Sequence, residues 1–332
     1  MCSSDLPAEQ TPLVAALAVG MLHSAGIPAN VLAFLPGDGR VGAAMVAARE
    51  CAGVAFTGST EVARIIARTL AGKDGPLVPL IAETGGQNAL IADSSALPEQ
   101  IVRDVVASAF NSAGQRCSAL RVLFVQADIA ERVSTMLAGA MQELRIGDPA
   151  DLRTDVGPVI DEAARKVLVA HASWLDSFAK PLYTCTLDER ATSHGSFFAP
   201  CAYEIDSLSR LEREIFGPIL HIVRWRGEDL DKVCDAIAST GYGLTLGIHS
   251  RIEDTVRRIT ARLHVGNTYV NRNVIGAVVG VQPFGGEGLS GTGPKAGGPH
   301  YLYRFASERT LSVDTTAAGG NASLMALDAS DD

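Results

Sequence analysis

The residues with the clearest capacity for chemistry are Cys117 and Glu83. Cys117 lies in Phe-Asn-Ser-Ala-Gly-Gln-Arg-Cys-Ser (110–118), between a predicted helix and an apolar strand. A thiol in such a short connection can face a cleft, and Arg116 beside it would favour the thiolate that attacks carbonyls. Glu83 follows the apolar run 77–82 and opens Glu-Thr-Gly-Gly-Gln-Asn. A cysteine and a strand-end carboxylate suggest covalent catalysis with a general base, although a lone cysteine can equally be a small buried hydrophobe.

The elements that would position these residues alternate between strand and helix. This alternation predicts a parallel, doubly wound α/β sheet. Only two strand–helix units precede Glu83, whereas a dinucleotide-binding domain has two halves of about three strands, so we expect that domain to be partial. Strands are predicted at 31–35, 54–57, 77–82, 120–125, 197–204, 219–225, 244–249 and 268–271. Helices are predicted at 11–24, 41–50, 62–70, 98–112, 129–144, 162–178, 229–238 and 252–263, a loop at 276–298, and an extended strand or ribbon at 300–313.

Composition excludes several classes of protein. A length of 332 residues suits two domains, and the net charge of −9 argues against a nucleic-acid-binding surface. The 6 cysteines form no CxxC pair, so we expect neither a disulfide framework nor a zinc site, and a reducing cytoplasm. The apolar stretch 13–22 follows acidic residues and ends in a helix stop, so it is no signal peptide. No stretch is long enough to span a membrane.

The two polar motifs resemble the active-site signatures of the aldehyde dehydrogenase superfamily. Within it the chain resembles the L-glutamate γ-semialdehyde (1-pyrroline-5-carboxylate) dehydrogenase module of bifunctional proline-utilization enzymes, from about Pro7 to the end. The resemblance implies an aldehyde dehydrogenase fold, a homo-oligomer and, in the intact protein, an upstream proline dehydrogenase domain. The implied divisions are a partial NAD-binding domain at 1–82, a catalytic domain with Cys117 at 83–290, a return and oligomerisation ribbon at 291–316 and a tail at 317–332.

The same resemblance assigns NAD and substrate contacts. The turn at Gly58 lacks GxGxxG and would otherwise be an ordinary strand–helix turn, and the two glutamates would otherwise be solvated charges. By resemblance, the cofactor-binding residues are Glu9, Thr57, Gly58, Ser59, Glu214 and Phe216. In glutamate semialdehyde enzymes the positions of Ser118, Gly276 and Ala277 bind the amino-acid end, and Phe284 matches an aromatic wall beside the aliphatic chain. Without the resemblance, the glycine-rich loop could equally make only a turn, although its N–H groups suit an anion.

Two departures from the family pattern matter. Leu6 replaces a lysine that contacts the adenosine ribose, and residues 1–6 match nothing in the family. The Trp-Asn-Phe-Pro stretch, whose asparagine helps to hold the oxyanion, is absent. We therefore expect this chain to be the carboxyl-terminal two-thirds of a dehydrogenase module and inactive alone, with an exposed strand edge at 31–35 or 54–57.

The intact module would oxidise L-glutamate γ-semialdehyde with NAD through a Cys117 thiohemiacetal and thioester, with Glu83 activating water. Three alternatives remain: a dehydrogenase for another aldehyde, a non-catalytic remnant that binds nucleotide or stabilises an assembly, and a cysteine hydrolase. The hydrolase is disfavoured because no histidine adjoins Cys117 in the sequence.

Overall fold

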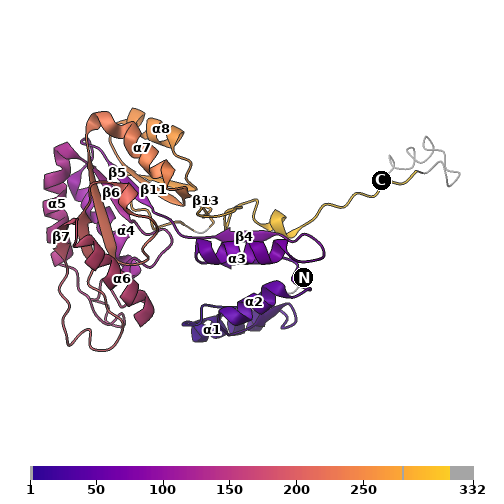
Figure 1. The fold of residues 1–332 in the computed structure, drawn as a ribbon. Helices are drawn as coiled ribbons and strands as arrows, with labels where there is room; N and C mark the ends of the chain where they lie inside the picture. The colour runs from indigo at the N-terminus through magenta and orange to yellow at the C-terminus, as the bar shows by residue number, and fades with distance from the viewer. Residues whose placement is uncertain (1–2, 279, 315–332) are drawn as a thin grey trace.

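The centre of the fold is a mixed sheet of seven strands (Figure 1). The computed structural model describes residues 3–278 and 280–314. Neighbouring strands are parallel except β7 and β8, which are antiparallel. In spatial order the strands are β12 (Asn267–Val270), β11 (Thr245–His249), β5 (Ala89–Ala92), β6 (Val122–Gln126), β9 (Ile219–Trp225), β8 (Cys201–Glu204) and β7 (Lys180–Thr184).

The inner strands are apolar on both faces, which requires helices on both sides of the sheet. Every residue of β5 is buried, as are Val122 to Val125 of β6. α4 begins with Pro98 at its first turn, and it buries Ile101 and Val105 in the same core. The covering helices are α4 (Pro98–Phe110), α5 (Ala127–Gln142), α6 (Glu162–Leu175), α7 (Leu230–Ser239) and α8 (Glu253–Arg262).

The part before Glu83 contains two separate two-stranded parallel sheets. β1 (Ser3–Asp5) pairs with β2 (Leu32–Phe34), and β3 (Val54–Thr57) pairs with β4 (Leu80–Glu83). The accompanying helices are α1 (Pro12–Ser24), α2 (Gly39–Ala47) and α3 (Thr60–Ala71). The predicted strands and helices are therefore present, but among the described residues they do not join into one doubly wound sheet. The expectation of a bare edge at 31–35 is corrected in part, because residues 3–5 cover one edge of β2.

Several predicted boundaries differ from the structure. The helix predicted to reach residue 112 ends at Phe110, because Ser112 and Ala113 adopt left-handed backbone conformations with φ of 56° and 52°. β5 and β7 were not predicted, since β5 is Ala-Leu-Ile-Ala with one β-branched residue and β7 contains Pro181. The predicted loop 276–298 contains the two-residue strand β13 (Glu287–Gly288), which pairs with β10 (Tyr242–Gly243).

The carboxyl-terminal prediction needs the largest correction. The predicted strand 300–313 contains a 3₁₀ turn at Leu302–Phe305 instead, and no strand is formed in the rest of 300–314. A strand exists only when a neighbour satisfies its backbone groups, and no such partner contacts this segment within the part that the structure describes. The tail at 317–332 lies outside the described residues. Within 3–278 and 280–314, no helix is long and apolar enough to cross a membrane.

Candidate active site

The loop that carries Cys117 is built from unusual backbone conformations. α4 is followed by a 3₁₀ turn at Asn111–Gly114, in which Gly114 also has a left-handed φ of 64°. A Cβ at Gly114 would lie 2.4 Å from the carbonyl oxygen of Gly217, so only glycine allows this close approach. The turn packs the loop against Gly217, in the segment before β9. The chain then passes through Cys117 into β6.

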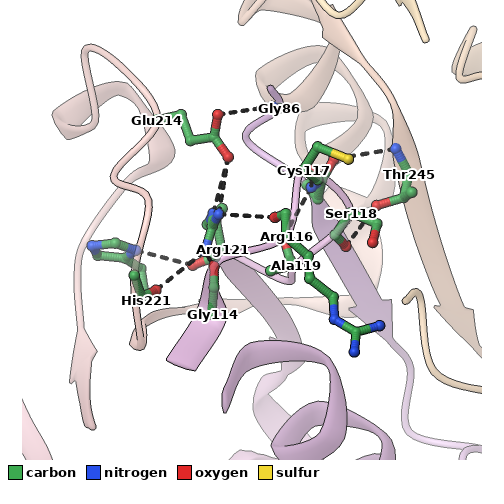
Figure 2. A network of polar contacts seen from close by, with 12 residues as sticks. Gly86, Gly114, Arg116, Cys117, Ser118, Ala119, Arg121, Glu214, His221 and Thr245 are labelled. Carbon is green, nitrogen blue, oxygen red and sulfur yellow. Dashed lines mark hydrogen bonds and ion pairs between the residues drawn. The ribbon is translucent and has the colours of Figure 1, made fainter. Parts of the chain in front are cut away.

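Hydrogen bonds from two other strands hold the loop in place. The Asn88 side-chain amide donates to the carbonyl oxygens of Cys117 at 2.6 Å and Ala119 at 2.9 Å. The Thr245 hydroxyl donates to the carbonyl of Ser118 at 3.2 Å, and the Thr245 N–H donates to Asn88 Oδ1 at 3.1 Å. Asn88 precedes β5 and Thr245 opens β11. Figure 2 shows Thr245 beside Ser118. The backbone around the thiol is thereby fixed before any substrate arrives.

The Glu214 carboxylate is buried beside this loop and is paired with Arg121. Oε1 of Glu214 accepts from Arg121 Nη2 at 3.0 Å and Nε at 3.2 Å, and Oε2 accepts from the Gly86 N–H at 3.1 Å. Burial raises the pKa of Glu214, and the Arg121 charge opposes that rise. The Arg121 guanidinium also lies over the ring of Phe216, 5.1 Å from its centroid, and that ring is 45% exposed. Glu214 and Phe216 are therefore held by one arginine.

The charge environment of Cys117 differs from the sequence expectation. Burial raises the pKa of the Cys117 thiol, the Ser118 N–H lowers it, and the carboxylates of Glu214 and Glu83 raise it further. Arg116 does not play its expected part, because its Nε donates to Ser112 Oγ at 3.0 Å and its guanidinium turns away from the sulfur (Figure 2). Without ligands the thiol is the favoured form at neutral pH, so attack on a carbonyl requires a base.

Glu83 has the arrangement expected of such a base. Its Oε2 accepts from the Gly286 N–H at 2.9 Å, whereas Oε1 is buried without a hydrogen-bond partner. Burial raises the pKa of Glu83, while the Gly286 N–H and the Lys295 ammonium lower it. A Cβ at Gly285 or Gly291 would come within 2.9 Å or 2.8 Å of the carboxylate oxygens. The glycine-rich segment thus forms a close-fitting cradle that leaves one carboxylate oxygen available.

The turn predicted to bind NAD lies next to Glu83. Thr57 of β3 pairs in register with Glu83 of β4, and the Gly58 N–H donates to the Glu83 carbonyl at 3.1 Å. Ser59 caps α3, its hydroxyl accepting from the Val62 N–H at 3.3 Å. An exposed Glu61 follows in the first turn, its pKa lowered by its own N–H and by the Ser59 hydroxyl. The structure therefore joins the turn and Glu83 through two paired strands.

The remaining predicted residues occupy separate surroundings. Ser118 is buried in the Cys117 loop, and the carbonyl of Gly276 accepts from Arg272 Nη2 at 2.7 Å. Phe284 exchanges two backbone hydrogen bonds with Ala296, at 3.0 and 2.8 Å. Ala277 is half-buried and Glu9 is exposed in the turn before α1. The substrate and ribose roles of these residues stay predictions.

Four residues of the site were missed as functional candidates: Asn88, Arg121, Thr245 and Lys295. Asn88 was noticed in its motif but given no role. Arg121 had a visible signal, because it is a single charge inside the apolar run 119–125. Thr245 and Lys295 had none, since their partners are distant in sequence: Lys295 lies near Glu83 and donates to the carbonyl of Gly266.

Comparison with known proteins agrees with this geometry. The bifunctional protein PutA of Klebsiella aerogenes is 54% identical over 311 residues, covering 91% of this chain and 24% of that protein. A crystal structure of bifunctional proline utilization A superposes with a TM-score of 0.92 at 60% identity, covering 96% of this chain and 32% of that one. The 1-pyrroline-5-carboxylate dehydrogenase from Thermus with bound NAD gives a TM-score of 0.85 at 33% identity, covering 92% and 59%.

The chain therefore spans about a quarter of the length of the curated relative. These likenesses confirm the predicted α/β fold of the aldehyde dehydrogenases. A family model described as the aldehyde dehydrogenase family matches residues 6–311. The match covers most of the chain, and we conclude that the chain belongs to the aldehyde dehydrogenase family.

Proposed function

We propose that this chain provides the site for the NAD-dependent oxidation of L-glutamate γ-semialdehyde to L-glutamate, the second step of proline catabolism. The observation that carries the proposal is that the short segment 83–88 ties together Glu83, Glu214 and Cys117. Glu83 begins the segment, its Gly86 N–H donates to Glu214 at 3.1 Å, and its Asn88 amide donates to the Cys117 carbonyl at 2.6 Å. Both carboxylates also raise the pKa of the thiol. The names of the relatives, PutA and 1-pyrroline-5-carboxylate dehydrogenase, support this substrate. A thiol with a nearby general base and buried charge is suited to covalent catalysis on an aldehyde.

The residues present fit NAD at two places. At the nicotinamide end, Glu214 presents a fixed carboxylate and Phe216 a partly exposed aromatic face. At the diphosphate end, Gly58 and Ser59 open α3, whose N-terminus favours an anion. A Cβ at Gly58 would lie 2.4 Å from the Phe56 ring, so this turn suits glycine. Glu9 would contact the adenosine ribose. Bound NAD supplies the acceptor for the hydride of the aldehyde.

The mechanism follows from the positions of the side chains. Glu83, whose pKa is raised by burial, can take up the thiol proton and leave Cys117 as the thiolate. The sulfur then attacks the aldehyde carbon and forms a thiohemiacetal, and the Cys117 N–H faces the developing oxyanion. The family's oxyanion asparagine belongs to the Trp-Asn-Phe-Pro segment, which this chain does not contain. Glu83 passes the thiol proton to solvent before the next step. After oxidation to the thioester, the ionised Glu83 takes a proton from water, the hydroxide attacks the thioester, and glutamate is released with Cys117 as the leaving thiolate.

Substrate choice is assigned to the loop near Gly276. Ser118, Gly276 and Ala277 would bind the α-carboxylate and amino group, and Phe284 would line the aliphatic chain. The Gly276 carbonyl is held by Arg272 at 2.7 Å, which keeps the loop in one conformation. A site built to hydrogen-bond one end of a substrate discriminates strongly against aldehydes that lack it.

The setting of the enzyme is part of the proposal. The cysteines of the described part are free thiols, which suits a reducing cytoplasm. A homo-oligomer and an upstream proline dehydrogenase domain are proposed from the resemblance and from the name of the bifunctional relatives.

The test is to purify the chain and a fusion that restores the Trp-Asn-Phe-Pro segment from a relative, and to follow NADH formation. We expect the fusion to oxidise glutamate semialdehyde in preference to a simple aliphatic aldehyde. No NADH from a folded fusion would contradict the proposal, and equal rates on both aldehydes would favour a dehydrogenase of another specificity. The same assay decides whether the chain alone is inactive.

A further inference from the structure

Arg121 is the most completely bonded side chain around Cys117. A guanidinium carries five N–H donors, and in Arg121 all of them are used. Nη1 donates to the carbonyls of Gly114 at 2.7 Å and Gly217 at 3.1 Å. Nη2 donates to the carbonyl of Arg116 at 3.2 Å and to Glu214 Oε1 at 3.0 Å, and Nε donates to the same oxygen at 3.2 Å. The side chain is only 2% exposed.

The acceptors of Arg121 belong to two segments that are distant in sequence. The carbonyls of Gly114 and Arg116 flank the approach to Cys117 on the α4–β6 connection. Glu214 and Gly217 belong to the segment that enters β9, almost a hundred positions later. The planar side chain thus links the two segments by hydrogen bonds (Figure 2). Its own backbone is fixed too, because its N–H donates to the Asn88 carbonyl at 3.0 Å and its carbonyl accepts from the His221 N–H at 3.0 Å.

We propose that Arg121 is a positioning residue that holds the Cys117 loop and the Glu214 carboxylate in one rigid unit and neutralises Glu214 beside the thiol. Only the naming of Glu214 as the nicotinamide-ribose ligand rests on the proposed function. The rest of the proposal rests on the hydrogen bonds of Arg121 given above. Arg116, the arginine next to Cys117 in sequence, makes none of these side-chain contacts and lies at the surface.

Charge and hydrogen-bond geometry give Arg121 two separable effects. The charged or titratable groups that face its side chain are Glu214 and Cys117, and His221 lies behind its carbonyl. Glu83 also raises the pKa of Cys117. A buried arginine opposite Glu214 limits how far that carboxylate disfavours the thiolate. The planar fork, which lysine cannot reproduce, fixes the loop carbonyls.

The test measures the thiol and the loop without cofactor or aldehyde. The variants are Arg121→Lys, Arg121→Met and the double variant Arg121→Met with Glu214→Gln, and Arg116→Met is the matched control. Two quantities are compared with the unmodified chain. The first is the pH profile of iodoacetamide alkylation, read by mass spectrometry on the Cys117 peptide. The second is hydrogen exchange across residues 112–118, with the strands of the seven-stranded sheet as the internal reference.

Each variant has a distinct expected result. In Arg121→Met the alkylation midpoint should rise by about one pH unit, because Glu214 is left uncompensated near the thiol. Alkylation at pH values below both midpoints should then slow about tenfold. In Arg121→Lys the midpoint should stay near that of the unmodified chain, but residues 112–118 should exchange faster. The double variant should recover the midpoint and not the protection of the loop. Arg116→Met should match the unmodified chain in both measurements.

Several results would overturn the proposal. One is a folded Arg121→Met variant with unchanged alkylation and exchange. Another is an equal increase in exchange over the whole sheet, which would make Arg121 a general stabilising residue. If Arg121→Met does not fold, the test uses Arg121→Lys and the double variant instead. Hydrogen exchange of residues 112–118 as slow as in the unmodified chain, in either variant, would refute the positioning role. A lack of dehydrogenase activity would count only against the proposed function, because neither measurement depends on catalysis.

Discussion

Replacement of Glu83 by glutamine is the sharpest test of the catalytic assignment. The amide matches the carboxylate in size, which matters because the cradle leaves little room around the two oxygens. The amide oxygen can replace Oε2 as the acceptor of the Gly286 N–H, now 2.9 Å away. The amide nitrogen would replace Oε1, which has no hydrogen-bond partner to lose. Glu83→Gln therefore removes the base while keeping the cradle.

The expected loss falls on the second half of the reaction. A positioned general base contributes typically about 10²–10⁴ in rate, which corresponds to about 2.7–5.4 kcal/mol in the barrier. In the variant, solvent must take up the thiol proton in place of Glu83, so each site should still release one equivalent of NADH in a first turnover and then turn over slowly. Steady-state turnover should fall by that factor while NAD binding is retained.

The pH dependence of turnover and of stability in wild type and in Glu83→Gln gives an independent check of the role of Glu83. Burial raises the pKa of Glu83 above its ordinary value of 4.5 in the folded chain. A base must be ionised, so wild-type turnover should fall as the pH drops through this raised pKa, and that limb should disappear in the variant. The folded state holds the Glu83 proton to higher pH than the unfolded state. Ionised Glu83 thus costs stability above its folded pKa and costs none below its unfolded pKa. Glu83→Gln should melt higher than wild type at neutral pH and lose this advantage near pH 4.

The assay is stopped-flow NADH fluorescence in the fusion enzyme, followed by thermal melts at both pH values. Steady-state turnover within tenfold of wild type would refute the role of Glu83 in deacylation. Loss of both the burst and NAD binding would instead identify Glu83 as a structural residue. A lower melting temperature of Glu83→Gln than of wild type at neutral pH would contradict this expectation. It would show that hydrogen bonds and charges stabilise the ionised Glu83 carboxylate by more than its burial costs.

Three further substitutions test other parts of the site. Cys117→Ala should abolish aldehyde oxidation while NAD still binds, as measured by NADH formation and by titration of bound nucleotide. Ala277→Leu should raise KM for glutamate semialdehyde far more than for propanal, and equal losses would mean that the loop is only distorted. Gly266→Ala should destabilise the fold by about 1–3 kcal/mol, because its Cβ would lie 1.9 Å from the carbonyl oxygen of Gly285. Gly139→Ala is the matched control in urea melts, since nothing lies within 4 Å of its Cβ, and it should be neutral or slightly stabilising.

Hydrophobic periodicity predicted the long helices and strands well, because the pattern of side chains that they bury can be seen within each element's own sequence. α4 and α5 each have one face of apolar side chains, and β9 is a long apolar strand, so sequence patterns alone locate them. β5 was missed because its four residues, Ala-Leu-Ile-Ala, include only one β-branched side chain, and β7 was missed because Pro181 lies inside it. The predicted ribbon at 300–313 was wrong because alternation shows only that a segment could pair, not that a partner is present.

The site was predictable where one short motif contains the chemistry. Cys117 and Glu83 were proposed from their own stretches, and their catalytic roles stay predictions. The structure places charged groups near both, Glu214 near Cys117 and Lys295 near Glu83. The role of Arg116 was mispredicted because adjacency in sequence says nothing about the direction of a side chain. Arg121, five positions after Arg116 and directly before β6, is the arginine that is buried next to the Cys117 loop.

The segment 83–88 explains why so much of the site depends on one stretch. It is the crossing from β4 to β5, so its backbone passes between the two parts of the fold. Its residues bond to three distant segments. The Thr84 hydroxyl donates to the Leu289 carbonyl at 2.5 Å, and the Gln87 amide donates to the Leu211 carbonyl at 2.8 Å. Glu83 bonds to the glycine cradle, Gly86 bonds to Glu214, and Asn88 bonds to the Cys117 loop. This crossing therefore places Glu83, Glu214 and Cys117 relative to one another. If these residues act as proposed, a substitution in the crossing should impair catalysis more than it loosens the sheet on either side.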